Sequence, residues 1–428
     1  MLTLLGAVTV RLLIREVLFL SMDCFKKRYF RRAILTIYNR YNNIIEDLEA
    51  ESLFLLGPRQ TGKTTWLRKE LASAVHFNLL DPGFRIRSAE FPVQFLEEAR
   101  FAIRKNPKVR IVFDEIQKIP ALLDPIQELM VSAPDARFLL TGSCARKLRR
   151  SGMNLLGGRA GMARFCPLTL RECQSWEGHT RTWNELLTSG GLPRAVLAKD
   201  PTRILASYAD IYLTEEVAAE GLVRNIPEFA NFLRVAAATN ANQIVFEKLA
   251  SDIQMTSKSV RNWFQILEDT LLGEMLKPFS HTVIRKPLTS AKFFFFDCGV
   301  ANYLRGANLQ KPNSEDSGVA LENLIYMELK AQISTFRKQH KLFYWRSQSK
   351  AEVDFIVTDS KERPILAIEV KSTDRLKEEH TKGIKAFAEE FPNIRKIIVF
   401  TGKRARFRVD GIEAWPVEQF LLELDTFL

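Results

Sequence analysis

Short apolar runs alternate with amphipathic segments along the first half of the chain. Residues 52–56, 76–80, 109–115 and 137–140 are apolar enough for strands that are buried on both faces, which is typical of parallel sheets. A helical pattern at 65–70 closely follows the first run. This alternation predicts an α/β fold built on a doubly wound parallel sheet.

The pattern becomes helical in the middle of the chain. Apolar residues recur at helical spacing in 226–239, 245–253 and 257–272, and a three-residue turn separates the last two segments. Candidate β wings follow at 275–278 and 283–296. The order helix, turn, helix and wings predicts a helix-turn-helix of the winged type.

Two features of this middle region carry further expectations. Lys258, Arg261 and Asn262 lie near the start of the second helix, where a recognition helix presents contacts to DNA. Winged helices also serve ATPases as lids or subunit contacts, so both roles stay open. The four phenylalanines 293–296 suit a strand that is buried on both faces.

The last third of the chain returns to an α/β pattern. A helix-like stretch at 320–332 precedes three apolar runs, 342–346, 352–357 and 365–371, which we interpret as strands, the first two as a hairpin. We therefore expect a second α/β domain at the C-terminal end.

Length and composition agree with several globular domains. The chain has 428 residues, of which 46% are hydrophobic and 26% charged, and this excludes a disordered chain and a polytopic membrane protein. The predicted division is an N-terminal extension, a first α/β domain, a helical and winged-helix domain and a second α/β domain, over 1–34, 35–200, 201–290 and 291–428.

Charge points to an anionic partner. The chain has 62 Lys and Arg against 50 Asp and Glu, a net charge of +12, which favours nucleic acid or a membrane surface. Five cysteines without C-x-x-C spacing are typical of a reducing cytoplasm, where we expect the protein to act.

The first 21 residues are apolar but interrupted by charges, so a spanning helix is not expected and membrane association is disfavoured. Two interpretations stay open. One is an amphipathic helix, and the other, which we prefer, is an upstream extension with translation starting at Met22.

The first apolar run leads into a phosphate-binding motif. G-x-x-x-x-G-K-[ST] stands between a predicted strand and a predicted helix, the context that this motif requires. Its glycines let backbone N–H groups face the phosphates, Lys63 reaches the β- and γ-phosphates, and the Thr64 hydroxyl is a Mg²⁺ ligand. The predicted ATP-binding residues are Gly57, Pro58, Arg59, Gln60, Thr61, Gly62, Lys63, Thr64, Thr65 and Asp114.

Acidic and polar residues end the next strands. Asp114 can hold Mg²⁺, and Glu115 can orient or deprotonate the attacking water. Ser143 follows the strand at 137–140, where it either senses the γ-phosphate or belongs to an ordinary turn.

A basic stretch without any acidic residue covers 136–171. It either supplies an arginine finger or forms a solvated or DNA-facing loop. Arg159 is the first candidate for such a finger and Arg146 the second, acting in their own subunit or in a neighbouring copy of a homo-oligomer.

Together these motifs resemble a known family. GPRQTGKTT, IVFDEIQKIP, LLTGS, LLGGRAG, PLTLREC and GGLP, in this order, are similar to prokaryotic AAA+-like P-loop ATPases of the STAND-related group, whose C-terminal domain of unknown function resembles PD-(D/E)xK nucleases. The resemblance runs from about residue 35 to the end. It implies an ATPase core, a winged helix and a restriction-endonuclease-like domain.

A second constellation lies in the C-terminal region. Asp354, followed by Glu369 and Lys371, resembles the PD-(D/E)xK pattern, although Val353 replaces its proline. Asp354 and Glu369 can hold Mg²⁺, Lys371 can assist the nucleophile, and Glu322 matches an additional acidic residue of such nucleases. Cleavage and non-cleaving DNA binding stay open as alternatives.

Residues 391–409 are basic and free of acids, which suits either phosphate contacts or a solvated hairpin. We therefore expect a Mg²⁺-dependent ATPase that acts as a nucleotide switch on nucleic acid, with DNA as partner and a metal-dependent nuclease domain. The alternative is a non-cleaving regulatory switch.

Overall fold

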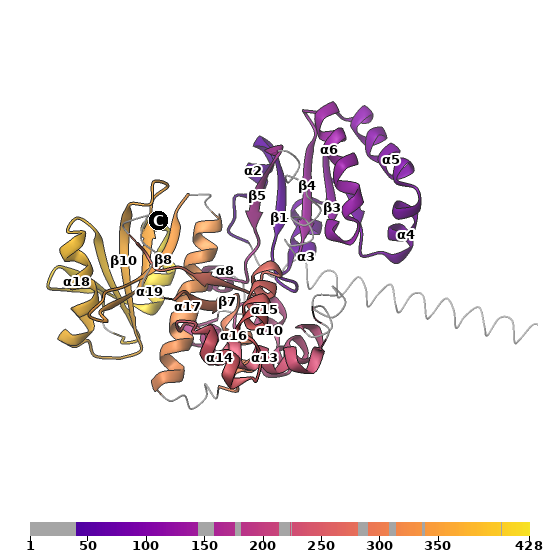
Figure 1. Cartoon of the computed structure of the whole chain (residues 1–428). Coiled ribbons are helices and arrows are strands. Elements are labelled where there is room, and N and C mark those ends of the chain that lie inside the picture. The colour runs from indigo at the N-terminus through magenta and orange to yellow at the C-terminus, as the bar shows by residue number, and fades with distance from the viewer. Residues whose placement is uncertain are drawn as a thin grey trace, which may run out of the picture.

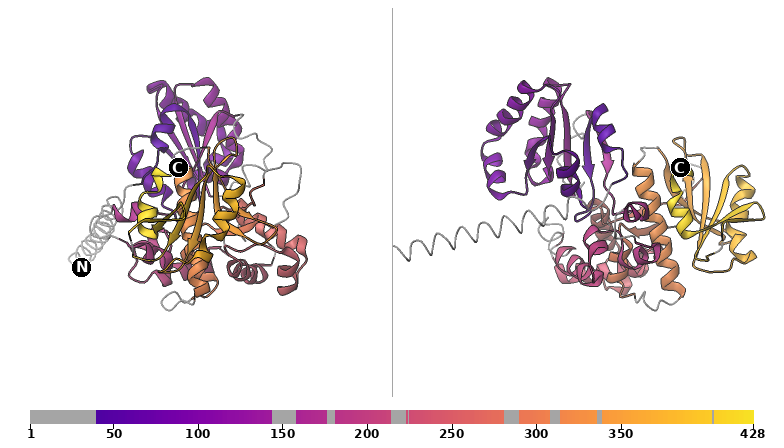
Figure 2. Two further views of the ribbon diagram at one scale, coloured as in Figure 1. Left: turned by 90° about the vertical axis from the view of Figure 1, so that its left-hand side faces the viewer. Right: turned by 180° about the vertical axis from the view of Figure 1, so that it is seen from behind.

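The structure, a computed structural model, describes residues 40–143, 158–175, 181–213, 223, 225–280, 290–307, 314–335, 339–403 and 405–428. The predicted N-terminal extension and Arg146 lie outside these residues. Figure 1 shows an N-terminal α/β part, a helical part beside it and a C-terminal α/β part, and Figure 2 gives two further views.

The N-terminal part is built on a five-stranded, entirely parallel sheet in the order β2-β3-β4-β1-β5. Its strands span Ser52–Leu56 (β1), Val75–Asn78 (β2), Arg110–Asp114 (β3), Arg137–Gly142 (β4) and Ala160–Arg164 (β5). The prediction of an α/β fold with a parallel sheet is confirmed, and this sheet is consistent with a P-loop fold.

Helices cover both faces of this sheet because its central strands are apolar on both sides. Ile111 and Phe113 of β3 pack in the core formed with α5 and α6, whereas Val112 packs against α2 and α3. Figure 1 shows α5 and α6 on one side of the strands. The helices span Ile44–Ala50 (α2), Lys63–Glu70 (α3), Pro82–Glu90 (α4), Pro92–Lys105 (α5) and Leu123–Ser132 (α6).

The middle part is helical around one antiparallel ribbon, β6 (Gly273–Leu276) paired with β7 (Lys292–Phe295). Two helices joined by a short turn precede the ribbon, as expected, and the second wing is described only from residue 290. The helices span Leu170–Gln174 (α8), Trp183–Ser189 (α9), Pro193–Leu197 (α10), Pro201–Ala206 (α11), Ile226–Ala238 (α13), Phe246–Asp252 (α14), Ser257–Asp269 (α15) and Cys298–Leu304 (α16), with a π-helix at Ser207–Leu213.

The phenylalanine run fills two cores at once. Phe293 and Phe295 of β7 are fully buried in the aromatic core of the helical part, where the Phe264 and Phe293 rings lie 4.9 Å apart. Phe294, on the opposite face, stacks on Tyr326 with a centroid distance of 4.3 Å. The expectation of burial on both faces is thus met by the structure.

A buried aspartate connects α16 to the loop that follows α9. Asp297 caps α16 by accepting a hydrogen bond from the Val300 N–H (3.0 Å), and it also accepts one from the Gly191 N–H (2.8 Å). A Cβ at Gly190 would lie 2.0 Å from an Asp297 oxygen. Gly190 is therefore required because the loop passes directly over this carboxylate, and Gly191 is required because a Cβ there would lie 2.3 Å from the Leu168 carbonyl oxygen.

The C-terminal part has a mixed six-stranded sheet in the order β12-β13-β11-β10-β9-β8. Its strands span Lys341–Arg346 (β8), Glu352–Thr358 (β9), Pro364–Lys371 (β10), Arg395–Phe400 (β11), Phe407–Val409 (β12) and Ile412–Pro416 (β13). As predicted, β8 and β9 are antiparallel neighbours. Helix α18 (Lys382–Glu390) packs on one face, while α17 (Ser314–Thr335) and α19 (Val417–Leu422) pack on the other.

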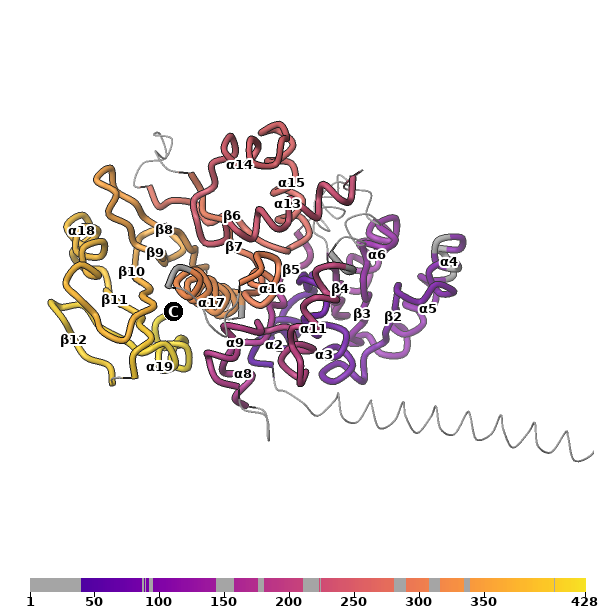
Figure 3. Tube along the Cα trace, turned by 90° about the horizontal axis from the view of Figure 1, so that it is seen from below, coloured from indigo at the N-terminus to yellow at the C-terminus, as the bar shows by residue number. Residues whose placement is uncertain are grey.

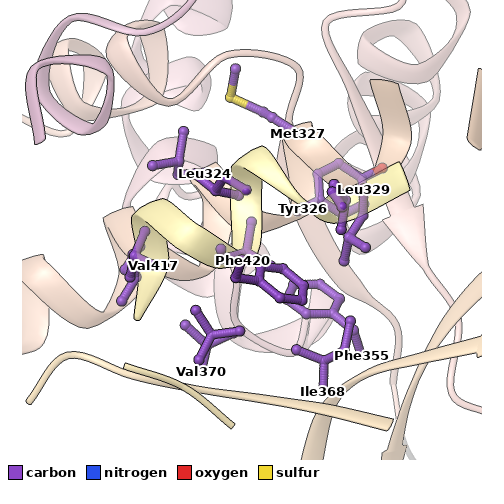
Figure 4. Close-up of a cluster of buried hydrophobic side chains, with 14 of the residues drawn as sticks. Leu324, Tyr326, Met327, Leu329, Phe355, Ile368, Val370, Val417 and Phe420 are labelled. Carbon is purple, nitrogen blue, oxygen red and sulfur yellow. The ribbon is translucent and has the colours of Figure 1, made fainter. Parts of the chain in front are cut away.

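Helix α17 joins the three parts. It contacts β10 of the C-terminal sheet, α9 and α16 of the helical part and β5 of the first sheet. Figure 3 shows it between the C-terminal sheet and α16, and Figure 4 shows its side chains, among them Leu324 and Tyr326, in the shared hydrophobic cluster. In the described part of the chain, no helix combines the length and the apolar character needed to span a membrane.

Candidate functional site

A tight loop connects β1 to α3 at the carboxyl edge of the first sheet. The backbone of Gln60 and Gly62 is left-handed, with φ of 59° and 95°, and Gly62 directly precedes the first turn of α3. At Gly57 a Cβ would lie only 2.3 Å from the Phe165 carbonyl oxygen. The loop therefore depends on its glycines, and the unpaired N–H groups of the first turn of α3 offer donors to an anion.

The Lys63 ammonium group lies inside this loop. It donates hydrogen bonds to the carbonyl oxygens of Gly57 (2.6 Å) and Pro58 (2.8 Å). Burial lowers the pKa of Lys63 to about 8, although the carboxylates of Glu115 and Asp114 favour the charged form. A phosphate group would replace the two carbonyl partners with a stronger, anionic one.

Thr64 and Asp114 form a pair suited to Mg²⁺. The Thr64 hydroxyl donates to Asp114 Oδ2 (3.1 Å), and the Thr141 hydroxyl donates to Asp114 Oδ1 (2.5 Å). Neighbouring ligands of an octahedral Mg²⁺ ion lie about 3 Å apart, so the Thr64 and Asp114 oxygens fit two adjacent positions. Burial raises the pKa of Asp114, and the hydrogen bonds from Thr141 and Thr64 oppose this.

Glu115 and Ser143 meet beside this pair. The Ser143 hydroxyl donates to Glu115 Oε2 (3.2 Å), and the Glu115 N–H donates to the Thr141 hydroxyl oxygen (3.0 Å). Glu115 has a left-handed φ of 65°, which turns its side chain out of the direction of β3. Arg59 Nε donates to the Ser143 hydroxyl (3.3 Å) from the phosphate-binding loop.

Gln117 is a member of this network that the motif analysis did not single out. Its buried amide donates to Glu115 Oε2 and to the Ser143 hydroxyl (3.0 Å). Gln117 therefore holds the carboxylate and the hydroxyl in fixed positions. Its place in the sequence, two residues after Glu115 in IVFDEIQKIP, is the signal that could have indicated it.

The comparison with family models agrees with this geometry. Residues 49–174 match an AAA domain. Residues 180–311 and 317–420 match two domains of unknown function, DUF8612 and DUF4143. The N-terminal part is thus similar to AAA-type P-loop ATPases, and its match covers every residue of the network around Lys63.

Relatives of similar length exist in mycobacteria. An uncharacterized protein of Mycobacterium bovis and one of Mycobacterium tuberculosis are each 26% identical to this chain over 381 residues. In both cases the match covers 87% of this chain and 81% of the relative, so it runs through the AAA, DUF8612 and DUF4143 matches.

Of the remaining residues predicted for the ATP site, two lie in or next to the phosphate-binding loop and one lies at the opposite edge of the sheet. Thr61 donates to the Pro58 carbonyl oxygen (2.8 Å) and shapes the loop, and Thr65 lies half-buried on α3. Arg159, in contrast, directly precedes β5, whose first residue Ala160 pairs with Ser52. Because all strands are parallel, Arg159 lies at the amino edge of the sheet, opposite the site of its own chain.

In the C-terminal part the structure brings the four predicted residues into one neighbourhood. Asp354 and Glu369 are buried on β9 and β10, and the Val370 N–H donates to Asp354 Oδ2 (2.8 Å). Lys371 contacts Glu369 Oε1. Burial raises the pKa of Glu322 to about 7, and the Asp354 carboxylate adds to this while Lys292 opposes it.

A lysine from another part of the chain lies within these carboxylates. Lys292 Nζ lies 2.8 Å from Glu322 Oε1, 2.7 Å from Glu352 Oε1 and 3.7 Å from Asp354 Oδ1. In the described residues no group of three or more His, Cys, Asp or Glu side chains is arranged to hold a metal ion. Lys292 is the second residue that the sequence motifs missed. Its signal in the sequence is a lysine at the start of an otherwise apolar strand.

Proposed function

We propose that this protein binds ATP together with Mg²⁺, hydrolyses it and uses the cycle as a conformational switch. One observation carries the proposal. Thr64, Asp114, Glu115 and Ser143 are linked by hydrogen bonds, partly through the Thr141 hydroxyl, at the carboxyl edge of the sheet. Lys63 begins α3 at the same edge and binds the carbonyl oxygens of the loop before it. The AAA domain match covers the same residues.

Each residue has a role that follows from its position. Lys63 binds the phosphates, and Thr64 and Asp114 would hold Mg²⁺, which neutralises charge on the transferring phosphoryl group. Glu115 orients the attacking water and accepts its proton. Ser143 and Arg59, linked at 3.3 Å, lie where contacts to the γ-phosphate would report its loss.

The test separates hydrolysis from binding. Glu115→Gln keeps the size and the hydrogen bonds of the side chain but removes the base, so the ATP turnover rate should fall about 100-fold or more while ATP binding persists. Glu70→Gln, on the exposed end of α3, is the matched control and should retain wild-type turnover. Equal turnover in the wild type and Glu115→Gln would refute the proposed hydrolysis.

We further propose that the switch acts on nucleic acid through the helical part. The helix–turn–helix order of α14 and α15, followed by the β6–β7 ribbon, supports a winged helix in this region. Lys258 and Asn262 are exposed on the first turns of α15, while Arg261 is paired with Glu247 (3.0 Å) and stacked on Phe246. Lys258 and Asn262 are therefore the better candidates for contacts to DNA.

The position of Arg159 bears on oligomer formation. At the amino edge of the sheet it is too far from the phosphate-binding loop of its own chain to act as an arginine finger, because the length of β1 separates the two. We propose that any finger role of Arg159 is exerted on a second copy in a homo-oligomer.

For the C-terminal part we favour the non-cleaving alternative over a metal-dependent nuclease. Asp354, Glu369 and Lys371 lie close together, as a nuclease of the PD-(D/E)xK type requires. The ammonium group of Lys292, however, lies among the carboxylates that would hold the metal ion. Mg²⁺ therefore does not fit this cluster as it stands.

A further inference from the structure

The C-terminal carboxylate cluster comprises Glu322 of α17, Glu352 and Asp354 of β9 and Glu369 of β10. The cation within it comes from a different family match. Lys292 belongs to the DUF8612 match, whereas all four carboxylates belong to the DUF4143 match. The ion pairs therefore join two regions that are separate units in the family models.

Lys292 is buried, and its position is fixed by its backbone. It pairs with Leu276 across the β6–β7 ribbon and bridges to Gln243. The next three residues of β7 are fully buried between two hydrophobic cores. Withdrawing the ammonium group would thus require moving a strand that is anchored on both faces, or leaving a buried charge without a partner.

The oxygens that a metal ion would need are occupied by groups of the chain. Asp354 Oδ1 faces Lys292 at 3.7 Å, and Asp354 Oδ2 accepts the Val370 N–H at 2.8 Å. Glu322 Oε1 pairs with Lys292, and Glu369 Oε1 pairs with Lys371. A divalent cation binds carboxylate oxygens at about 2.0–2.6 Å, and it cannot share this space with an ammonium group because the two positive charges repel.

One buried oxygen has no such partner. Glu369 Oε2 has no hydrogen-bond partner among the described residues. Asp354 Oδ1 and Glu322 Oε1 face the Lys292 ammonium group and would lose their cation if that group were absent. The cluster thus contains carboxylate oxygens of the kind that bind hard cations, and a lysine provides the positive charge among them.

We propose that Lys292 is a built-in substitute for the divalent cation in the C-terminal carboxylate cluster. The wild-type cluster accordingly binds neither Mg²⁺ nor Mn²⁺ and makes no metal-dependent cut in DNA. Its ion pairs instead fasten the ribbon of the helical part to the C-terminal sheet. This inference goes beyond the ATPase and does not depend on whether ATP is hydrolysed.

Removing the ammonium group should create a metal site. We would titrate Mn²⁺ into full-length protein without nucleotide and measure bound Mn²⁺ by electron paramagnetic resonance. Lys292→Met should bind one Mn²⁺ more than the wild type, at least about tenfold more tightly than any wild-type site, because three carboxylates lose their cation. The additional ion should disappear in Lys292→Met combined with Asp354→Asn.

The matched control is Lys341→Met, which makes the same change at an exposed lysine of β8 paired with Glu362. It should bind Mn²⁺ as the wild type does. If folded Lys292→Met binds no additional Mn²⁺, the cluster is not a latent cation site and the proposal is wrong.

A second comparison does not require Lys292→Met to fold. Wild type and Asp354→Asn should bind the same number of Mn²⁺ ions, and wild type and Asp354→Ala should leave plasmid DNA equally intact with Mg²⁺ or Mn²⁺. If Asp354→Asn binds one ion fewer than the wild type, or if only the wild type cuts the plasmid, Lys292 does not substitute for a metal ion. Neither result would affect the Glu115 test of the ATPase.

Discussion

The ammonium group of Lys63 has neutral hydrogen-bond partners, so an anionic phosphate would bind it more strongly than they do. It is buried, and two backbone carbonyl oxygens are its hydrogen-bond acceptors. A charged group with neutral partners in a buried loop is destabilised relative to water, and this is the cause of its lowered pKa. Bound phosphate would restore the pKa by supplying negative charge.

This linkage predicts a pH dependence of ATP binding. The free protein loses the Lys63 proton above a pKa of about 8, whereas the complex retains it, so affinity must fall as the pH rises through that value. The dissociation constant should be about tenfold higher at pH 9 than at pH 7. Isothermal titration calorimetry in two buffers of different ionisation enthalpy should detect proton uptake at pH 9.

The control for this prediction is Lys63→Arg, because a guanidinium group stays charged throughout the range. The residual affinity of this variant should not change between pH 7 and pH 9. A wild-type affinity that is equally flat would show that Lys63 is already anchored as a cation before ATP arrives.

At the scale of elements, the carboxylate of Asp297 fixes how α16 meets the loop after α9. Asp297→Ala would leave the Gly191 and Val300 N–H groups buried without acceptors, so the free energy of unfolding should fall by about 3 kcal/mol. Asp200 caps α11 in an exposed position, and Asp200→Ala should cost only about 1 kcal/mol. Urea denaturation measures both, and equal losses would contradict the account.

The elements differ in how far the sequence predicts them. Buried parallel strands appear as uninterrupted apolar runs, so β1 and β3 were predicted almost to the residue, together with Asp114 and Glu115 at the end of β3. The site around Lys63 follows, because parallel strands end at the same edge. The position of Lys292 could not be predicted in this way. Its partners are 30 or more residues away in the sequence, and the orientation of β7 decides on which face of the strand its side chain lies.

At the scale of the whole molecule, the basic stretches are less isolated from acidic residues than their sequence suggests. Arginines in stretches without acids are paired in space with acids from elsewhere in the chain. Examples are Arg164 with Glu274, Arg171 with Asp425, Arg395 with Glu413 and Arg406 with Glu423. In the described residues, part of the positive charge of these stretches therefore lies against acids of the same chain.

The three parts also meet close to the phosphate-binding loop. A cavity of about 40 Å³ is lined by Pro58 of the loop, Leu271 and Phe294 of the helical part and Tyr326 of α17. Leu271 is buried and belongs to the hydrophobic core of the AAA domain, although it follows α15 in sequence. A rearrangement of the loop on nucleotide binding would therefore change its packing against β7 and α17.

The proposed binding of DNA through α15 predicts a specific salt dependence. Lys258→Glu should weaken binding of a short DNA duplex, and it should reduce the slope of log affinity against log salt by about 1, because one phosphate contact is lost. Lys199→Glu makes the same charge change at another exposed position and should leave the slope unchanged. Fluorescence anisotropy over a range of salt concentrations measures both. Equal effects of the two variants would mean that only net charge matters.

The central claim is that Lys63 and its loop form an ATP site. The most direct test compares the ATP affinity of the wild type with that of Lys69→Ala and Lys63→Ala. Isothermal titration calorimetry with Mg²⁺ and ATP should give saturable binding for the wild type and for Lys69→Ala, which removes an exposed lysine from the same helix. Lys63→Ala, if it remains folded by circular dichroism, should show at least about 100-fold weaker binding, because the phosphates lose their charged partner. Wild-type ATP affinity in folded Lys63→Ala would contradict the account.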